Sequence, residues 1–407
     1  MSSLDTYLEA AGAWLRAHAE PRGASRELEW GRGPDGVFLF RDTSPEEERA
    51  GIEALKEWQR AKFDAGYGAI SRPAEYGGAG LPRAYEDGFR RLEAGFVIPA
   101  VADLVSISLE IEAPTILTLG TEEQKQRWLR PLRRGDLLCC QLFSEPGAGS
   151  DLGSIALRAE RDGEEWVLNG QKVWTSGAQY AELGIVICRT SRDAPRQQAF
   201  TAFVVPLDAP GITVLPLRQM TGGANFNEVF FDGARIPDSA RLGEVGGGWS
   251  AMMTTLGFER AAAARGGGGG GPDLFGRLVM TARQFGRLED PLVRQALADL
   301  YARNRMRSWT ARRAAASARA KGVPGPEGSL SKLALTRSLQ RAGEIATLLL
   351  GPAMVADTGE WGTYAWSELV CGTPGLRLGG GTDEIQKNTI AERALGLPRE
   401  PRVGTAS

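Results

Sequence analysis

Length, composition and charge limit what this chain can be. Its 407 residues can form two or three domains with sizeable cores, and 48 basic against 50 acidic residues give a net charge of −2. That balance points to neither nucleic acid nor an anionic membrane as a general partner. No apolar run approaches the roughly 18 residues that span a bilayer. The N-terminus has no basic start or cleavage pattern, so we expect a cytoplasmic protein.

Histidine and cysteine content narrows the chemistry. The single histidine, His18, excludes histidine-based metal sites, and its distance from every other motif speaks against a Ser/His/Asp triad. We expect it on the surface of the first helix. The cysteines form no CxxC spacing and suit reduced core thiols: Cys139, Cys140, Cys188 and Cys371. Proton chemistry must therefore rest on carboxylates or on a cofactor.

Helical patterns cover residues 1–135, which we assign to an N-terminal helical domain. Ser44 and Pro45 mark one helix start, and Thr121 begins another, with Gln124 at the return position of a capping box. Both starts precede apolar residues at helical spacing.

Strand patterns follow over residues 136–245. Alternating runs are broken at Asp162-Gly163 and at Asn169-Gly170, which are the two strongest short hairpin signals in the chain. Four further short runs follow closely without room for crossover helices, so we predict an antiparallel sheet or barrel.

Residues 246–400 turn helical again and predict a C-terminal bundle, with residues 401–407 as a tail. The glycine run from Gly266 to Gly271 favours a loop or a frayed helix. The segment from Tyr301 to Lys321 has seven basic residues and no acidic one. It could bind CoA phosphates or nucleic acid, but its sparse aromatic residues favour a solvated or subunit-facing helix.

Three segments combine small, polar and aromatic residues in a way that suits a ligand. Residues 137–154 (LLCCQLFSEPGAGSDLGS) let hydroxyls and backbone N–H groups converge, and residues 172–177 (KVWTSG) place an indole beside two hydroxyls. This suits a planar ligand with polar edges, such as a flavin, and equally a serine-rich turn with a core tryptophan. Residues 375–387 (GLRLGGGTDEIQK) set three glycines before the helix N-cap Thr382. Taken alone, that loop fits three interpretations: a nucleotide-binding loop, a catalytic loop or a tight turn.

Together these motifs resemble the signatures of the acyl-CoA dehydrogenase family, over about residues 50–400. The resemblance implies an α+β fold with an N-terminal α-helical domain, a middle antiparallel β-barrel domain and a C-terminal four-helix bundle, with FAD between them. It implies that a carboxylate removes the α-proton of an acyl thioester, on CoA or a carrier protein, while flavin N5 takes the β-hydride. An acceptor like electron-transfer flavoprotein would then reoxidise the flavin.

The resemblance also implies roles for single residues. Trp174 matches the indole that packs on the isoalloxazine ring, and Ser176 the hydroxyl that bonds flavin N5. The full set that it places at FAD is Gln141, Phe143, Ser144, Gly149, Ser150, Trp174, Thr175, Ser176, Arg283, Phe285, Thr382, Asp383 and Glu384. The set that it places at the acyl substrate is Ser150, Phe258, Arg260, Gly380 and Gly381. No metal is implied.

The catalytic base is missing from its usual place. Straight-chain members carry a glutamate immediately before the Gly-Thr of the C-terminal signature, and this position is Gly380 here. Asp383 and Glu384 lie on the helix side, where carboxylates suit FAD contacts or the helix end.

We predict Glu259 as the base. Its Glu-Arg pattern with Arg260 matches members whose base lies on the earlier helix: isovaleryl-CoA dehydrogenase, long-chain enzymes and bacterial enzymes of steroid side chains. Apolar neighbours, Phe258 and four alanines, would raise its pKa toward a useful value. By analogy, the substrate would be branched, cyclic or otherwise bulky.

Two departures leave alternatives open. The family's Gln-x-x-Gly-Gly reads Leu348–Pro352 here, without the glutamine, and Arg283 is displaced by one position from the usual register. FAD would then be held differently, or at only some sites of a homotetramer or an α2β2 heterotetramer. A flavin oxidase or monooxygenase on the same fold, and a non-catalytic subunit that completes a partner's FAD site, stay as rival hypotheses.

Overall fold

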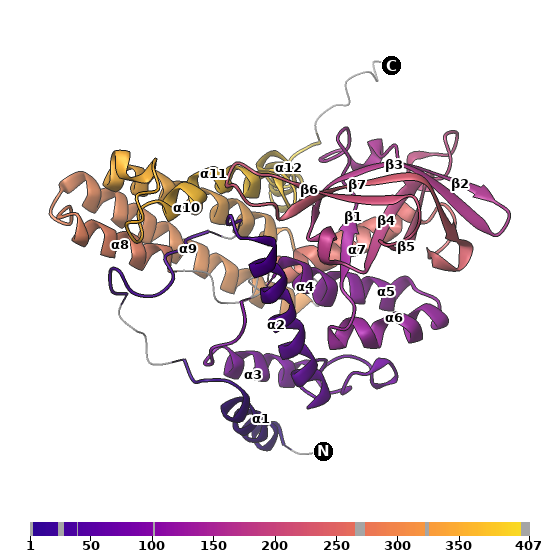
Figure 1. The fold of residues 1–407 in the computed structure, drawn as a ribbon, viewed down its shortest axis with the longest axis horizontal. Helices are drawn as coiled ribbons and strands as arrows, with labels where there is room; N and C mark the ends of the chain where they lie inside the picture. Colours follow the sequence, from indigo (N-terminus) through magenta and orange to yellow (C-terminus); the bar gives the residue numbers. More distant parts are fainter. Residues whose placement is uncertain are drawn as a thin grey trace.

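The protein has three parts in chain order: helices, a sheet, and helices again (Figure 1). The structure, a computed structural model, describes residues 3–22, 28–38, 40–100, 102–264, 273–321 and 325–399. The predicted three-domain α+β fold is confirmed. The glycine run from Gly266 to Gly271 and the tail 401–407 lie outside the described residues.

The N-terminal part is a layer of helices. They are α1 (Leu4–His18), α2 (Pro45–Asp64), α3 (Arg83–Glu93), α4 (Asp103–Ile107), α5 (Ala113–Leu119) and α6 (Glu122–Arg134). A π-helical segment, η2 (Ser108–Glu112), joins α4 to α5. Both predicted helix starts are confirmed, since Ser44 and Thr121 each form a complete capping box. His18 is exposed on α1 and stacks on Trp14, as expected of a surface histidine.

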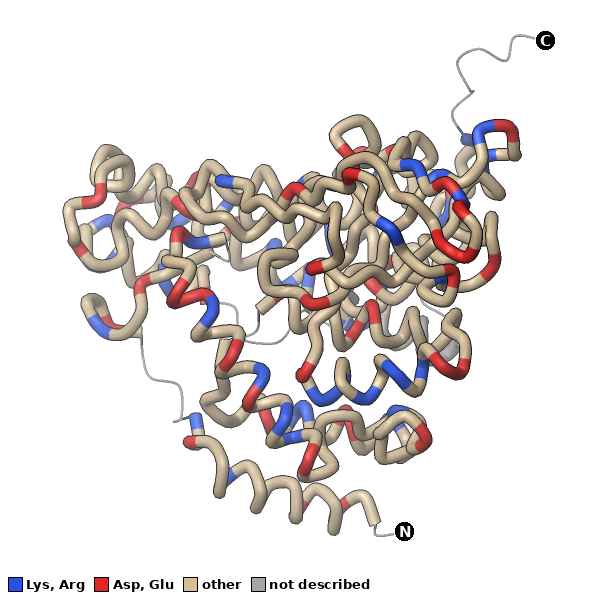
Figure 2. Tube along the Cα trace, turned by 45° about the vertical axis from the view of Figure 1, so that its right-hand side comes forward, with Lys and Arg blue, Asp and Glu red and all other residues tan. Residues whose placement is uncertain are grey.

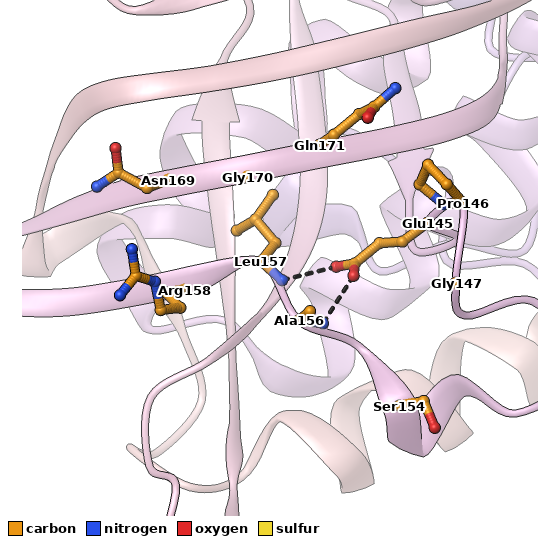
Figure 3. Close-up of a pocket in the computed structure, with 10 residues that line it drawn as sticks. All are labelled: Glu145, Pro146, Gly147, Ser154, Ala156, Leu157, Arg158, Asn169, Gly170 and Gln171. Carbon is orange, nitrogen blue, oxygen red and sulfur yellow. Dashed lines mark hydrogen bonds between the residues drawn. The ribbon is translucent and has the colours of Figure 1, made fainter.

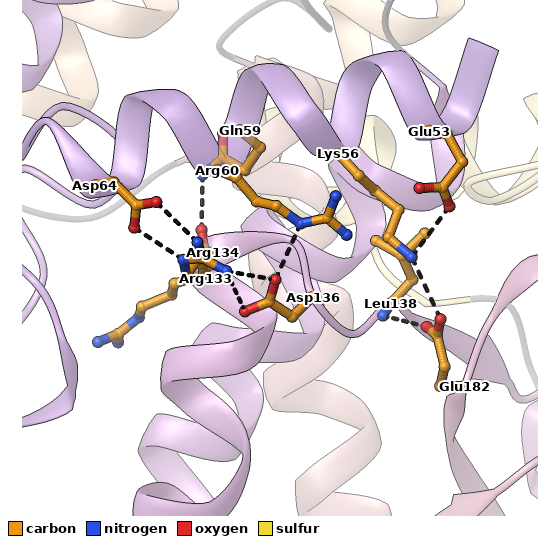
Figure 4. A network of polar contacts seen from close by, with 10 residues as sticks. All are labelled: Glu53, Lys56, Gln59, Arg60, Asp64, Arg133, Arg134, Asp136, Leu138 and Glu182. Atoms are coloured by element: carbon orange, nitrogen blue, oxygen red, sulfur yellow. Dashed lines mark hydrogen bonds and ion pairs between the residues drawn. The ribbon is translucent and has the colours of Figure 1, made fainter. Parts of the chain in front are cut away.

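Polar contacts join α2 to α6 and to the sheet (Figure 4). Arg134 lies between Asp64 and Asp136, at 2.8 Å from each, and Lys56 reaches Glu182 of the middle domain at 3.4 Å. Partly exposed ion pairs of this kind contribute only about 0–1 kcal/mol each. They therefore set the orientation of α2, while apolar burial supplies most of the stability.

The middle part is one sheet with strand order β6-β7-β3-β2-β4-β5-β8 and with β1 on β4. Its strands are β1 (Cys139–Leu142), β2 (Arg158–Asp162), β3 (Glu165–Ser176), β4 (Leu183–Arg189), β5 (Phe200–Pro206), β6 (Ile212–Leu217), β7 (Phe226–Pro237) and β8 (Arg241–Leu242). Most pairings are antiparallel, but β1 runs parallel to β4 and β2 meets β4 in parallel at one residue pair. The sheet is thus mixed, because the long excursion between β1 and β4 lets both strands run the same way.

One of the two predicted hairpins is confirmed and the other is wrong. Asp162 pairs with Glu165 across a tight turn, so β2 and β3 form a hairpin there. Asn169-Gly170 instead lies inside β3, at a register shift where Gly170 has φ +143°. A Cβ on Gly170 would come within 2.9 Å of the backbone of Leu157. The glycine therefore permits a bulge and a close strand approach, which the same dipeptide signals equally well.

Both faces of the sheet are covered at β4. Ile185 and Ile187 pack with apolar residues of α5, α6 and the first helix of the C-terminal part, whereas Val186 and Cys188 join the cluster on the opposite face. The four cysteines are free and three of them are buried, as predicted for reduced core thiols.

The C-terminal part is helical. Its helices are α7 (Gly248–Ala264), α8 (Leu274–Gln284), α9 (Pro291–Lys321), α10 (Glu327–Leu350), α11 (Ala365–Leu378), α12 (Asp383–Thr389) and the π-helical η8 (Ile390–Ala394). Short 3-10 turns elsewhere are Ala74–Tyr76, Leu152–Ser154, Ala178–Tyr180, Arg196–Gln198, Asp238–Ala240 and Gly351–Met354. Helices α8 to α11 pack side by side, and α7 packs against η2, α5, β5 and α10 (Figure 1). Helix α7 thus touches all three parts of the chain.

Charges of both signs alternate along the trace (Figure 2), in keeping with the near-zero net charge. On α9, Arg303 pairs with Asp299 at 2.9 Å and Arg305 lies over the ring of Trp309. Within the described residues, no helix is both long and apolar enough to cross a bilayer.

Candidate active site

Glu259 lies on α7 in a partly buried position and faces the first strand of the sheet. Its carboxylate accepts a long hydrogen bond, 3.4 Å, from Nε2 of Gln141 on β1. Burial raises the pKa of Glu259, and the Gln141 bond and the Arg260 charge offset only part of that rise. Arg260 is exposed and Phe258 is partly buried on the same helix. A carboxylate in this setting is a stronger base than one in water.

The glycine loop meets Glu259 from the other side. Gly380 and Gly381 have φ of +64° and +85°, a left-handed conformation that favours glycine. A Cβ on Gly380 would lie 3.5 Å from Oε1 of Glu259. The loop is held in place because Gln386 donates to the carbonyl of Gly380 and Lys332 to that of Gly381. The Glu259 carboxylate therefore lies directly beside the place where a side chain at residue 380 would begin.

The carboxylates after the loop are engaged elsewhere. Thr382 caps α12 as predicted, accepting from the N–H of Ile385. Asp383 is buried and accepts from Arg377 at 2.8 Å and from Thr336. Burial alone would raise the pKa of Asp383, but the Arg377 guanidinium and the Thr336 hydroxyl hold it below its usual value.

Glu384 is exposed and pairs with Lys387 at 3.6 Å. It thus points to solvent at the start of α12. Of Glu259, Asp383 and Glu384, it is Glu259 that lies beside the loop, partly buried and with a raised pKa.

The segment from Gln141 to Ser150 runs from β1 into an exposed turn. Phe143 is buried, Ser144 is partly buried, and Gly149 and Ser150 are exposed. The Ser144 carbonyl accepts from the N–H of Val173, which ties the segment to β3. The segment thus lies beside the indole-bearing strand, as the resemblance requires.

A buried ion pair anchors this segment, and sequence reasoning missed it. Lys172 is fully buried and donates to Glu145 at 2.8 Å and to the carbonyl of Phe143 at 3.0 Å. Glu145 also accepts from the N–H groups of Ala156 and Leu157 (Figure 3). The strand pattern around Lys172 does not predict this ion pair, because it does not indicate which glutamate the lysine contacts.

An open pocket of about 420 Å³ lies behind the Glu145 turn (Figure 3). Its walls come from β2, β3 and the turn, and they include neither Glu259 nor Trp174. This pocket is therefore separate from the base.

Trp174 has the one positive φ among the described residues that are not glycine, +61°, at a register shift between β3 and β7. Such a backbone costs roughly 1–2 kcal/mol for a bulky residue. The indole is 56% exposed and meets Phe226 edge-on, with ring centroids 6.0 Å apart. The strain thus presents a flat apolar ring at the surface of the sheet.

Two hydroxyls follow the indole. Thr175 is buried, and its Oγ1 has no partner within the described residues, whereas Ser176 is partly buried at the end of β3. An exposed indole beside an unpartnered hydroxyl fits a planar ligand with a polar edge, such as a flavin ring.

Arg283 and Phe285 are not brought to this site. Arg283 is exposed near the end of α8, and Phe285 packs edge-on against Trp30 at 5.8 Å. Helix α8 lies at the opposite end of the molecule from β3 (Figure 1). Phe226, which meets the Trp174 indole, packs in the same apolar cluster as Phe285, so this cluster connects the indole to the end of α8.

Known proteins match this arrangement. Family models for the N-terminal, middle and C-terminal domains of acyl-CoA dehydrogenases match residues 41–136, 140–234 and 246–395. This chain belongs to the acyl-CoA dehydrogenase family. Members of the family are FAD-dependent oxidoreductases that act on CH–CH bonds of acyl-CoA.

Several relatives are similar over most of the chain. Acyl-CoA dehydrogenase IpdE1 of Mycobacterium tuberculosis is 38% identical, covering 88% of this chain and 92% of its own. FadE34 of the same organism is 39% identical over 97% of this chain, which spans 53% of FadE34. The solved structure of the Tcur3481-Tcur3483 steroid ACAD has a TM-score of 0.75 at 27% identity, covering 98% of each chain. The ChsE4-ChsE5 complex of M. tuberculosis has a TM-score of 0.71 at 25% identity, covering 98% of this chain and 99% of its own.

One buried acid near the base was not predicted. Glu112, the last residue of η2, is fully buried, and neither carboxyl oxygen has a hydrogen-bond partner within the described residues. Burial and the charge of Glu259 raise its pKa well above the usual value. Regular helical spacing could not reveal it, because the π-helical segment changes which side chains turn toward α7.

Proposed function

We propose that this acyl-CoA dehydrogenase removes the α-proton of an acyl thioester with Glu259 and forms a trans-2-enoyl thioester. The main support is a distance: a Cβ added to Gly380 would lie 3.5 Å from Oε1 of Glu259. The base has changed its position in the chain, but its carboxylate lies beside the place that a glutamate at residue 380 would occupy. Partial burial and the raised pKa of Glu259 support the same role.

Several residues would assist the step. Gln141 keeps the carboxylate oriented through its amide N–H, and Arg260 favours the ionised form. Trp174, Thr175 and Ser176 would hold the flavin ring: the indole by stacking, the hydroxyls by hydrogen bonds. When bound, FAD supplies the acceptor for the β-hydrogen and its electron pair.

The acyl group is proposed to be branched, cyclic or otherwise bulky. A base on α7 and a bare glycine at residue 380 support this, because the missing side chain leaves room beside the carboxylate. The likeness to a steroid ACAD of known structure agrees with a bulky substrate. CoA is the proposed carrier, and an acyl carrier protein is the alternative.

The assembly is proposed to be a homotetramer or an α2β2 heterotetramer, with an acceptor like electron-transfer flavoprotein. The shifted register of Arg283 and the missing glutamine at Leu348–Pro352 support this, because FAD would then be held differently or at only some of the sites. Two chains together form the ChsE4-ChsE5 complex, which this chain resembles.

Anaerobic mixing with acyl-CoA thioesters of graded bulk tests the proposal. Bleaching of the flavin without O₂, strongest for bulky acyl groups, supports dehydrogenation. No bleaching with any thioester, but turnover with O₂, supports an oxidase. A chain that is colourless alone and yellow only when co-expressed with a homologue supports a non-catalytic subunit.

A further inference from the structure

Glu112 lies on η2, which packs against the helix that carries the base. The segment η2 packs against α7 and against β1, and the charge of Glu259 acts on the Glu112 carboxyl. Ser108, four residues earlier, bonds both the N–H and the carbonyl of Cys139, which fixes η2 on β1. The position of Glu112 is thus rigid, although its own oxygens are unpartnered.

Among the described residues, no cation acts on the Glu112 carboxyl. Cys139 and Cys140 on β1 feel its charge, and burial raises the pKa of both thiols, so they are neutral. On neighbouring helices, Asp103 of α4 does not interact with it, and Arg133 of α6 donates to the carbonyl of Tyr76.

Glu110, on the same segment, is engaged in an ion pair with Arg90. Glu259 is therefore the one charged group that faces Glu112 among the described residues.

Burial with no partner decides the protonation state. An isolated buried carboxylate costs several kcal/mol, so the group binds a proton instead. A second negative charge beside Glu259 would add repulsion. A neutral carboxyl keeps one O–H donor, and a buried donor without a partner is itself costly. The ionised base, whose charge acts on Glu112, needs a donor, because its long bond from Gln141 satisfies only one of its oxygens.

We propose that Glu112 is a positioning residue for Glu259: it is a neutral acid whose O–H group is the donor for the ionised base, directly or through one water. The two carboxyl groups together carry one negative charge when the base is ready. After Glu259 has taken the α-proton it is neutral, so the Glu112 O–H no longer has a charge to stabilise. The inference rests on the proposed role of Glu259 as base.

Two substitutions separate the possible roles. Glu112→Gln keeps a neutral donor of similar shape, and Glu112→Leu keeps the volume but removes the donor. Glu110→Gln is the matched control, since it removes a carboxyl from the same segment. Each variant is studied as the FAD-loaded enzyme, with its folding checked by thermal unfolding.

Infrared spectroscopy at neutral pH tests protonation without turnover. We expect a carbonyl stretching band of a protonated carboxylic acid in the parent and in Glu110→Gln, and its loss in Glu112→Gln. A spectrum of Glu112→Gln that keeps the whole band would overturn the inference, because Glu112 would then be ionised in the parent.

Flavin reduction against pH tests the donor role. In Glu112→Leu we expect the rate to fall about tenfold or more, and the acid limb to move to higher pH, because the ionised base loses a hydrogen bond. Glu112→Gln should keep the rate within about threefold and leave the limb in place. An acid limb in Glu112→Gln that moves to lower pH, or a Glu112→Leu variant that matches the parent, contradicts the inference.

Failure of the proposed function is distinguishable. If Glu259→Gln bleaches at the parental rate, the base assignment fails whatever the Glu112 variants show. If Glu259→Gln is inactive while Glu112→Leu behaves as the parent, only the role of Glu112 fails.

Discussion

We predict that the catalytic carboxylate can be moved from residue 259 to residue 380, its usual place in straight-chain members of the family. In Glu259→Gly the general base is lost, which lowers the rate of flavin reduction by roughly 10² to 10⁴. A second change, Gly380→Glu, places a Cβ 3.5 Å from the former Oε1. A glutamate side chain spans about that distance from its Cβ to its carboxylate oxygens, so the new carboxylate can occupy the old space.

Recovery should be partial. Gly380 has φ +64°, and a residue with a Cβ there is strained by about 1–2 kcal/mol. We therefore expect the double variant to exceed Glu259→Gly by about tenfold or more without reaching the parental rate. The assay is anaerobic single-turnover bleaching with one bulky acyl-CoA, after FAD content and thermal stability have been matched. A folded, FAD-loaded double variant that is no faster than Glu259→Gly refutes the reasoning.

Three further changes test other parts of the site. Lys172→Met leaves the Glu145 carboxylate buried without its cation, so the free energy of unfolding from urea titration should fall by about 3–5 kcal/mol; a loss under about 1 kcal/mol contradicts the buried pair. Trp174→Gly relieves a φ of +61°, so the apoprotein should gain about 1 kcal/mol while FAD content per chain falls; unchanged FAD content speaks against the stacking role. Glu112 has a raised pKa, so folded protein keeps a proton that the unfolded chain releases above about pH 4. Stability from this group is complete at lower pH and is lost as pH rises. Glu112→Gln should therefore gain stability relative to the parent between about pH 4 and 7, and a pH-independent difference refutes this.

The sequence predicted the fold and several helix starts because local signals and tertiary packing agree there. Helices begin after Ser44 and Thr121, as the capping boxes predict, and Thr382 caps α12. Hairpin chemistry succeeded at Gly163 but failed at Gly170, since a glycine of positive φ serves a turn and a bulge equally.

The rest depends on contacts between distant segments. The pairing of Lys172 with Glu145 and the burial of Glu112 involve side chains that no spacing rule connects. Asp383 is an ordinary helix-start carboxylate in the sequence, yet Arg377 and Thr336 occupy it in the structure. Such roles follow only from packing, because a charged residue looks the same in sequence whether it is solvated or paired.

The most direct test of the account is Glu259→Gln, measured by anaerobic flavin bleaching with a bulky acyl-CoA. Removal of the base should slow bleaching by roughly 10² to 10⁴ at unchanged FAD content, whereas Glu123→Gln, a matched change at an exposed position on α6, should leave the rate unaltered. Because the pKa of Glu259 is raised, the parental rate should fall with decreasing pH through a value above the usual 4.3 of glutamate. Bleaching of Glu259→Gln at near the parental rate would contradict the central claim that this carboxylate removes the α-proton.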